Sequence, residues 1–198
     1  MCAVSSTPDR VTSFRKMPSP VGHFLAGMAV GSFGSHRKWW PMAAVCGLAA
    51  VLPDVDFLLP VAHRGPTHSL LAGFATGIAA FVVMSAMSGK VAGRRIALLL
   101  ALAVLSHVLL DWLGQDSSTP RGVMALWPFN THYYISDVNV FKAVDRRYWL
   151  PGFWRRNLIA VARELLILVP VLVIAVRINT RRSPGRTSGQ GDQPPPSA

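Results

Sequence analysis

The sequence places its rarest polar side chains at the ends of apolar segments. Among 198 residues, nine are Asp or Glu and six are His, against 20 Lys or Arg. The scarce residues that border or interrupt apolar stretches are His23, Asp54, Asp56, His63, His68, His107 and Asp111. Imidazole nitrogens and carboxylate oxygens form a ligand set that suits zinc, manganese, iron or magnesium better than copper(I). These residue types therefore predict a divalent metal site, with zinc as the first expectation.

Local spacing supports a shared site for these side chains. His107 and Asp111 are four residues apart, so on a helix they lie on one face. Asp54 and Asp56 follow a proline, and if the chain leaves the helix there, their two-residue spacing points both carboxylates the same way. His68 follows a Gly-Pro turn and lies beside the start of the next apolar segment, where Thr or Ser can cap a helix.

Five apolar segments must position these residues. They cover residues 21–34, 40–60, 69–88, 96–113 and 158–176. The first segment is short, because about 20 residues are needed to cross a bilayer core of about 30 Å. If the chain runs up and down through a membrane, four ends share one face: the start of the first, the end of the second, the start of the third and the end of the fourth. All the candidate ligands lie at those four ends, so the topology would gather them on one side.

Composition predicts the class of protein. The apolar residues make up 51% of the chain, charged residues are only 15%, and the mean hydropathy is +0.36. An ordinary soluble domain has about 25% charged residues, and a disordered chain has low hydrophobicity. We therefore expect an all-α, multi-pass membrane bundle of four to five apolar helices. The membrane-embedded domain is predicted over 17–177, between a disordered N-terminal extension at 1–16 and a disordered tail at 178–198.

The net charge of +11 adds little about partners. The cations flank the apolar segments on both faces, ten against nine in a five-span topology, so the positive-inside rule does not choose an orientation. A nucleic-acid partner is not expected, because no basic stripe on a soluble fold is visible. Membrane lipids are the expected partners.

The long connection at 114–157 mixes aromatic and basic residues. It holds nine of the 18 aromatic side chains together with six Lys or Arg, a composition that suits the lipid headgroup layer. The alternative is an ordinary loop with a small core of its own. Asp116, in this connection, is either an additional ligand or a turn residue. In the last segment, Arg163 and Glu164 either support the site or reach toward the membrane surface.

The energetics of buried charge favour a metal. A charged Asp within the hydrocarbon costs several kcal/mol, and carboxylates close together repel until one takes a proton. A divalent ion, or a pair of ions, removes both penalties. The first choice of ligands is Asp54, His68, His107 and Asp111, and His23 and His63 come next, completing a second metal. Asp56 is expected to be a ligand or the general base. Arg64 and Thr67 are expected to orient a phosphate or carbonyl oxygen, although an interfacial cation is an equal alternative for Arg64.

Several motifs resemble one known family. The pieces GHFLAG, LPDVD, HRGPTHSLLAG, LSHVLLD and GVMALWPF occur in order over residues 17–130. They resemble the YdjM-like family of LexA-regulated inner-membrane proteins, which are described as membrane-bound metal-dependent hydrolases. The resemblance implies an inner-membrane location and a metal-dependent hydrolytic activity. The stretch 114–120 is longer than the usual link of the family, and the region after residue 130 lies outside the match.

The leading hypothesis is a membrane-bound metal-dependent hydrolase that uses metal-activated water on a lipid or phosphoester at the membrane surface. An anionic lipid is the expected form of a lipid substrate. The alternative is a non-enzymatic integral membrane protein, either a metal-stabilised scaffold or a transporter. A transporter usually carries its ionisable residues at mid-membrane, between repeated halves. Here those residues lie at segment ends and no repeat is visible, which favours a surface site.

Overall fold

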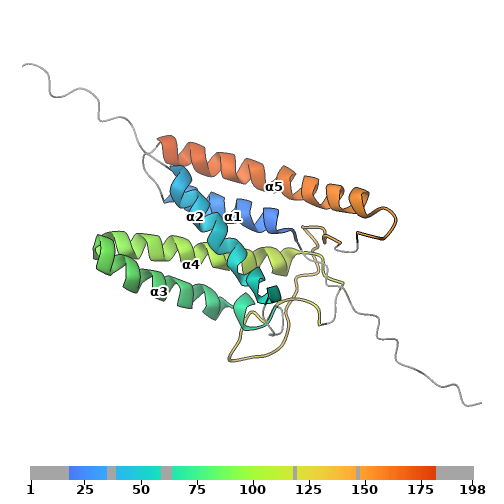
Figure 1. Ribbon diagram of the computed structural model, residues 1–198, viewed down its shortest axis with the longest axis horizontal. Helices are drawn as coiled ribbons and strands as arrows, with labels where there is room; N and C mark the ends of the chain where they lie inside the picture. The colour runs from blue at the N-terminus through green and yellow to red at the C-terminus, as the bar shows by residue number, and fades with distance from the viewer. Residues whose placement is uncertain (1–17, 35–38, 59–63, 118–119, 146–147, 182–198) are drawn as a thin grey trace, which may run out of the picture.

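A computed structural model describes residues 18–34, 39–58, 64–117, 120–145 and 148–181. Over these ranges the protein is an all-α bundle with two isolated β-bridges, as the sequence predicts. The helices are α1 (Pro20–Phe33), α2 (Trp39–Val51), α3 (Leu70–Ser88), α4 (Lys90–Leu113) and α5 (Phe153–Arg181), with the 3-10 helices η1 (Leu52–Leu58) and η2 (Pro66–His68) (Figure 1). The predicted N-terminal extension at 1–16 lies outside the described residues.

Three of the five helices are long and apolar enough to cross a membrane by length and composition, namely α3, α4 and α5. Helices α1 and α2 have 14 and 13 residues, fewer than the roughly 20 that a span needs. Both α4 and α5 extend beyond their predicted apolar segments, because Lys and Arg at helix ends are good helix formers whose charged groups reach water. Residues 178–181 therefore belong to α5, not to the predicted tail, and 182–198 lie outside the described residues.

Small residues let the helices pack in two close hairpins, α1 with α2 and α3 with α4. A Cβ atom added to Gly31 would lie 2.6 Å from the carbonyl oxygen of Met42 on α2. A Cβ atom on Gly73 would lie 2.6 Å from Cδ2 of Leu105 on α4. Each glycine belongs to a pair spaced four residues apart, the pattern by which membrane helices bring their backbones together.

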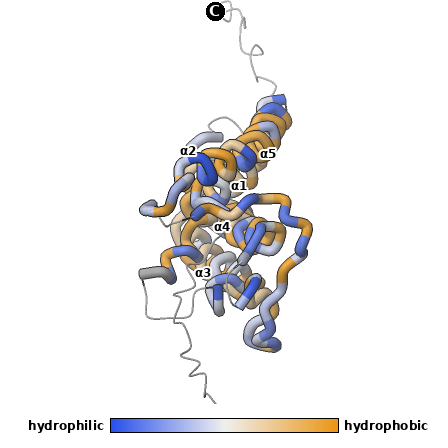
Figure 2. The backbone as a smooth tube through the Cα atoms, turned by 90° about the vertical axis from the view of Figure 1, so that its right-hand side faces the viewer, coloured by the Kyte–Doolittle hydropathy of each residue, from blue (hydrophilic) through white to orange (hydrophobic). Residues whose placement is uncertain are grey.

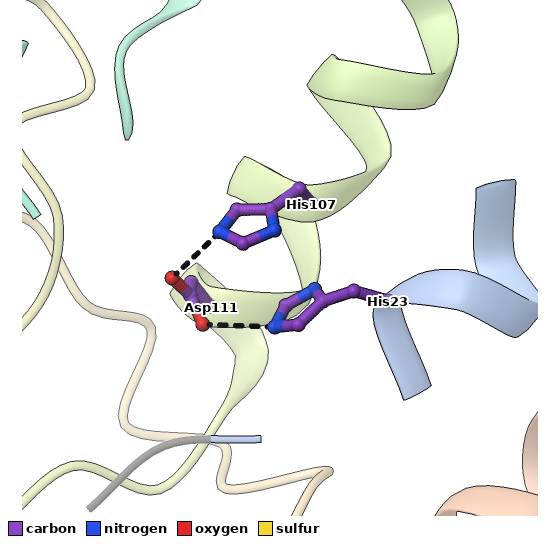
Figure 3. A group of neighbouring side chains, drawn as sticks. All are labelled: His23, His107 and Asp111. Carbon is purple, nitrogen blue, oxygen red and sulfur yellow. Dashed lines mark ion pairs between the residues drawn. The ribbon is translucent and has the colours of Figure 1, made fainter. Parts of the chain in front are cut away.

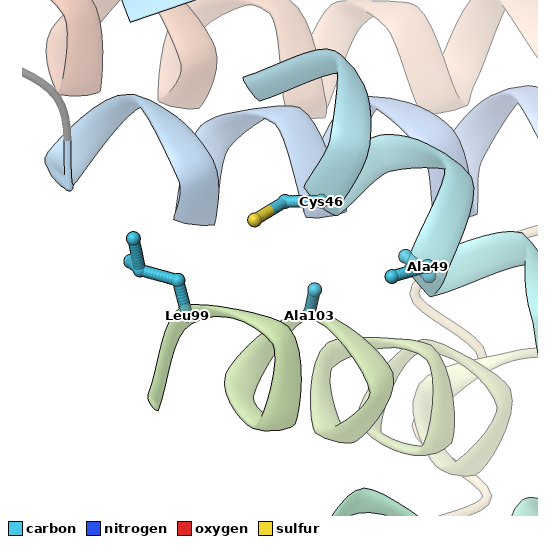
Figure 4. Close-up of a cluster of buried hydrophobic side chains, with 5 residues drawn as sticks. Cys46, Ala49, Leu99 and Ala103 are labelled. Carbon is cyan, nitrogen blue, oxygen red and sulfur yellow. The ribbon is translucent and has the colours of Figure 1, made fainter. Parts of the chain in front are cut away.

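The two hairpins meet where α2 packs on α4. Cys46 and Ala49 of α2 face Leu99 and Ala103 of α4 in a buried cluster (Figure 4). Because three of these four side chains are small, α2 lies close to α4. This contact brings the end of α2, and the 3-10 helix η1 that follows it, beside the last turns of α4.

Helix α5 covers α1 and is anchored there by a buried carboxylate. The backbone N–H of Ser19 donates to Glu164 Oε1 at 2.7 Å, and the Ser19 hydroxyl donates to Glu164 Oε2. Large apolar side chains on the outer faces of α3 and α5 are exposed. Figure 2 shows that much of α5 consists of hydrophobic residues. These outer faces suit contact with lipid tails. The exposed side chains include Phe74, Ile78, Val82, Leu158 and Leu166.

The up-and-down topology brings four helix ends together. Figure 1 shows the start of α1, the end of α2 with η1, the start of α3 and the end of α4 at the same end of the bundle. The start of α5 lies toward this end as well. The segment ends that carry the candidate ligands therefore converge, as the sequence predicts from alternating chain direction.

Candidate metal centre

His23 is positioned by the first turn of α1. Ser19 is the N-cap, its hydroxyl accepts a hydrogen bond from the N–H of Gly22, and Pro20 occupies the first helical position. The His23 side chain is fully buried, and its ring stacks on that of His107 with centroids 3.9 Å apart. The helix start thus holds one imidazole against another at the bundle end.

Asp54 and Asp56 lie on the 3-10 helix η1. Helix α2 ends at Val51 because Pro53 has no N–H and disfavours helical backbone in the residue before it. A 3-10 helix has about three residues per turn, so positions two apart point in different directions. Asp54 Oδ1 faces Nε2 of His68 at 3.6 Å, whereas Asp56 Oδ2 faces Nδ1 of the same ring at 3.4 Å. The chain therefore does not leave the helical state after Pro53, so the condition for both carboxylates to point the same way is not met.

Asp56 and Thr67 contact the Nδ1 side of the His68 ring. The Thr67 hydroxyl donates to Asp56 Oδ2 at 2.7 Å and lies 3.0 Å from His68 Nδ1. Ser69 then caps α3, since its hydroxyl accepts from the N–H of Ala72. With Nδ1 occupied on this side, Nε2 of His68 faces Asp54 and Asp111.

His107 and Asp111 share one face of α4, as their spacing predicts. Nδ1 of His107 lies 2.7 Å from the carbonyl oxygen of Ala50, which leaves Nε2 facing the carboxylate of Asp111. Three imidazoles face the carboxylate of Asp111. Oδ2 lies 3.4 Å from His107 Nε2 and 3.5 Å from His68 Nε2. Oδ1 lies 3.5 Å from His23 Nε2, and Figure 3 shows the contacts with His107 and His23. Asp111 therefore joins α1 to α4 through side chains alone.

Five side chains from four elements make up what we call the metal cluster. They are His23, Asp54, His68, His107 and Asp111. Two groups of three could each hold an ion, His23 with His107 and Asp111, and Asp54 with His68 and His107. In each group the candidate ligand atoms lie within 4.8 Å of one another. The two groups have His107 in common, and its one remaining nitrogen, Nε2, can bind only one ion. The cluster thus offers ligands for one ion, or for two if His107 serves only one of them.

The distances inside the metal cluster fit ligands better than hydrogen bonds. The nitrogen–oxygen pairs lie 3.4 to 3.8 Å apart, beyond the usual 2.7 to 3.2 Å of a hydrogen bond. Two ligands at about 2.1 Å from a tetrahedral zinc ion are about 3.4 Å apart. Several of these buried atoms have no hydrogen-bond partner within the described part of the chain, a costly state unless a cation satisfies them. They are both nitrogens of His23, Oδ1 of Asp54, Nε2 of His107 and both oxygens of Asp111.

Asp54 and His68, the cluster residues on the 3-10 helices, have shifted pKa values. Burial favours the neutral form of Asp54, but its contact with His68 and the charges of His107 and His23 outweigh burial and hold the pKa of the carboxyl below its usual value. Burial favours neutral His68 as well, but Asp54, Asp56 and the charge of Asp111 raise its pKa to about 9. Without a metal, this part of the cluster is therefore an ion pair between carboxylates and an imidazolium.

The other candidate site residues take different places. His63 lies outside the described residues. Asp56 and Thr67 are occupied with each other and with the Nδ1 side of His68. Arg64 is fully buried, which excludes the alternative of an interfacial cation, and its Nη2 lies 3.9 Å from Asp111 Oδ1. Asp116 pairs with Nη1 of Arg64 and also accepts from the N–H of Gly122 in its own connection. It belongs to neither group of possible metal ligands among the described residues.

The sequence gives little indication of two buried contacts in the structure. The Arg64–Asp116 pair joins positions 52 residues apart, and the Ser19–Glu164 contact joins positions 145 residues apart. No periodicity links residues at such separations. The only available signal was rarity, because acidic residues number nine and Glu164 is the one glutamate in the sequence.

Comparison with known proteins agrees with this architecture. A family model described as YdjM inner membrane protein matches residues 17–182. The chain belongs to this family. Two curated relatives, the Inner membrane protein YdjM of Escherichia coli (strain K12) and that of Shigella flexneri, are each 33% identical over 141 aligned residues. The alignment covers 54% of this chain and 64% of each relative, which is less than two thirds of their length. No solved structure matches the chain.

Membership of the YdjM inner membrane protein family accounts for the overall character of the molecule. The match over 17–182 includes all five helices and every member of the metal cluster. Together with the three helices long and apolar enough to span a bilayer, it makes the chain a multi-pass inner-membrane protein.

Proposed function

We propose that this protein is a membrane-bound, metal-dependent hydrolase that acts on a lipid or phosphoester at the membrane surface. The observation that carries the proposal is the metal cluster itself. Its buried nitrogens and oxygens converge from four elements at 3.4 to 3.8 Å, and most of them lack a hydrogen-bond partner among the described residues. A divalent cation satisfies such a set, and zinc fits the mixture of imidazole and carboxylate best.

Each residue of the site has a defined task in this proposal. Asp54, His68, His107 and Asp111 hold the ion, and His23 is the next ligand. When bound, a divalent ion acts as a Lewis acid and makes water acidic enough to be a nucleophile near neutral pH. In the hydrolysis the water oxygen forms a bond to phosphorus or to a carbonyl carbon, the ester bond breaks, and the leaving alcohol oxygen takes up a proton.

Two of the imidazoles, those of His68 and His107, are held in place by partners at Nδ1, away from the proposed ion. Asp56 and Thr67 hold the Nδ1 side of His68, and the carbonyl oxygen of Ala50 holds the Nδ1 side of His107. Such partners fix the ring orientation and direct the other nitrogen toward a metal. We therefore assign Asp56 and Thr67 to the positioning of His68, in place of direct contact with substrate.

The surroundings favour a substrate at the membrane surface. The cluster lies at one end of the bundle, and Asp54 is the member whose side chain is most accessible, at 13% exposed. The connection between α4 and α5 presents exposed aromatic rings, with Phe129 at 95% and Tyr148 at 75% exposed. Aromatic rings of this kind suit the headgroup layer, so a lipid or an ester close to it is the substrate class that location supports.

Metal analysis of the purified full chain tests the proposal directly. Protein extracted in a mild detergent should carry about one or two equivalents of zinc by elemental mass spectrometry, and His107→Ala and Asp54→Ala should each lose most of it. His132→Ala, which removes an exposed histidine outside the cluster, is the matched control and should keep the wild-type content. Wild-type protein without stoichiometric metal, even after incubation with zinc, would contradict the proposal.

An activity panel separates an enzyme from a scaffold or transporter. Turnover of phosphoesters, phospholipids or carboxylic esters by the metal-loaded protein, lost on chelation and restored by zinc, is expected for the hydrolase. Metal that stabilises the fold without any turnover across the panel would favour the scaffold. The cluster lies at the end of the bundle, whereas a transport site is expected near mid-membrane.

A further inference from the structure

Arg64 is a buried cation, and only part of its guanidinium has a hydrogen-bond partner among the described residues. It is 1% exposed, and within the described residues its Nε and Nη2 atoms have no hydrogen-bond partner. Nη2 nevertheless lies 3.9 Å from Oδ1 of Asp111, at the edge of the metal cluster. A guanidinium stays protonated in proteins, so these donors face the cluster with a positive charge.

The backbone of Arg64 is held in an unusual conformation that fixes where the side chain begins. Its φ angle is 63°, in the left-handed region that residues other than glycine rarely adopt. Two hydrogen bonds hold it there: the Arg64 N–H donates to Asp56 Oδ2 at 3.3 Å, and the Arg64 carbonyl accepts from Met124 N–H at 3.1 Å. Strained residues of this kind concentrate at functional sites.

One side of the guanidinium is anchored by Asp116. Nη1 donates to Asp116 Oδ2, and the same oxygen accepts from the N–H of Gly122 at 2.8 Å. Gly122 has a φ angle of 95°, and a Cβ atom there would collide with the backbone of Tyr134. The anchor is therefore built into the backbone of the connection. The donors on the other edge of the guanidinium, Nε and Nη2, have no hydrogen-bond partner among the described residues.

The unpaired edge of Arg64, which we call the fork, has donors arranged to bind an oxyanion at two points. Nε and Nη2 are adjacent donors in the plane of the guanidinium, and their two N–H bonds are nearly parallel. This is the edge that binds two oxygens of a carboxylate or phosphate at once. Because it lies beside Asp111, an oxyanion held on this fork would also face the metal cluster.

We propose that Arg64 binds a phosphate oxyanion beside the metal cluster and that the substrate is a phosphoester. This inference rests on the proposed function and narrows it. A phosphoryl group can place two oxygens on the fork and still direct a third toward the cluster. A carboxylic ester carries no oxyanion, and a carboxylate that uses both oxygens on the fork keeps none for the cluster. Asp116 is a positioning residue in this arrangement, since it acts on the substrate only through Arg64.

Direct binding of inorganic phosphate tests the inference without relying on turnover. Zinc-loaded full chain in a phosphate-free, uncharged detergent is titrated with inorganic phosphate, and binding is followed by 31P NMR. Arg64→Gln should weaken phosphate binding by about 10- to 100-fold, because a charged, two-point hydrogen bond is lost. The phosphate affinity of Arg64→Lys should lie between those of the wild type and Arg64→Gln, since lysine keeps the charge but cannot donate two parallel hydrogen bonds. Arg155→Gln, an exposed cation at the start of α5, should bind as the wild type does.

Asp116→Asn tests the positioning role. The amide oxygen can still accept from Gly122, but the charged partner of Nη1 is gone. Phosphate should therefore bind about threefold to tenfold more weakly, with the zinc content unchanged. A merely structural role for Asp116 would lower thermal stability and leave the phosphate affinity of the remaining folded protein at the wild-type value, which would contradict the positioning assignment.

A second set of measurements distinguishes a lipid phosphoester from a water-soluble one. Nanodiscs of phosphatidylcholine with or without phosphatidic acid are compared for displacement of bound inorganic phosphate. Displacement by phosphatidic acid supports a lipid phosphoester, and its absence, with Arg64-dependent binding intact, supports a water-soluble one. Equal phosphate affinity of Arg64→Gln and wild type in protein that holds zinc would overturn the inference and leave the metal-dependent hydrolase standing. Protein without metal would contradict the hydrolase, and the effect of Arg64→Gln on phosphate would still decide the oxyanion site.

Discussion

Nε2 of His107 lies 3.4 Å from Oδ2 of Asp111, one helical turn further along α4, without a hydrogen bond between them. The backbone of α4 determines this separation, because residues four apart lie above one another on a helix. Oδ1 of Asp111 continues the contact to His23 of α1 at 3.5 Å. The carboxylate of Asp111 is thus the centre of the cluster, and its properties lead to the first prediction.

Asp111→Asn is expected to lower zinc affinity by about 100-fold or more. The change keeps the shape of the side chain but removes the negative charge that faces three buried imidazoles. Loss of a ligand should exceed the roughly 10- to 100-fold effect of changes to the partners of metal ligands. Competition with a chromophoric chelator measures the affinity. Asp137→Asn, a carboxylate that is 66% exposed and pairs with Arg121, should bind zinc as the wild type does; equal affinities for both variants would count against Asp111 as a ligand.

Asp56→Asn is expected to weaken zinc binding by about 10- to 100-fold without changing the number of ions bound. Asp56 Oδ2 faces Nδ1 of His68 and accepts from Thr67, so its charge supports the ring from the side opposite the cluster. Thr67→Val should also weaken zinc binding, by a smaller factor than Asp56→Asn. Elemental analysis at saturating zinc gives the stoichiometry, and a complete loss of one ion in Asp56→Asn would instead identify Asp56 as a ligand.

Metal binding is expected to release protons and to strengthen as the pH rises. In the metal-free protein the pKa of His68 is raised to about 9 from an ordinary value of 6.5, so the ring is protonated near neutral pH. A metal must displace that proton, because only the neutral ring binds it. Asp54 contributes no proton in this range, since its pKa is lowered. Apparent zinc affinity should therefore rise by about tenfold per pH unit between pH 7 and 8 and level off above pH 9.

Isothermal titration in buffers of different ionisation enthalpy gives the number of protons released. About one proton per zinc ion at pH 7.5 is the expected result for His68. His132→Ala serves as a control for titration of an exposed histidine and should release the same number. A zinc affinity that does not change between pH 7 and 8 would contradict the protonated His68.

Glu164→Ala is expected to destabilise the bundle by about 1 to 3 kcal/mol. The fully buried carboxylate accepts from both the N–H and the hydroxyl of Ser19, so its removal leaves two buried donors at the start of α1 without an acceptor. Because His23 lies in the next turn, zinc affinity should fall as well. Chemical unfolding in detergent measures the stability. Arg163→Gln, on the neighbouring position of α5, is the control, and equal stability of the two variants would argue against the anchor.

Several features of the site could be predicted because they depend on short-range geometry. The shared face of His107 and Asp111 follows from helical periodicity, and the hydrophobic segments follow from composition. The convergence of four segment ends follows from alternating chain direction in a membrane. The relation of Asp54 to Asp56 could not be predicted in the same way, because it depends on η1 being a 3-10 helix, which places the two carboxylates on opposite sides of His68.

The sequence by itself determined that this is an all-α membrane protein with its scarce His and Asp residues gathered at one end. Those properties depend on hydropathy, periodicity and alternation, which are local or topological. The tertiary structure alone decided that Arg64 is anchored by Asp116 and that Ser19 is anchored by Glu164. A buried charge takes its partner from whichever helix or loop packs against it, so that choice depends on how the hairpins and the connection come together in space, and no spacing along the chain encodes it.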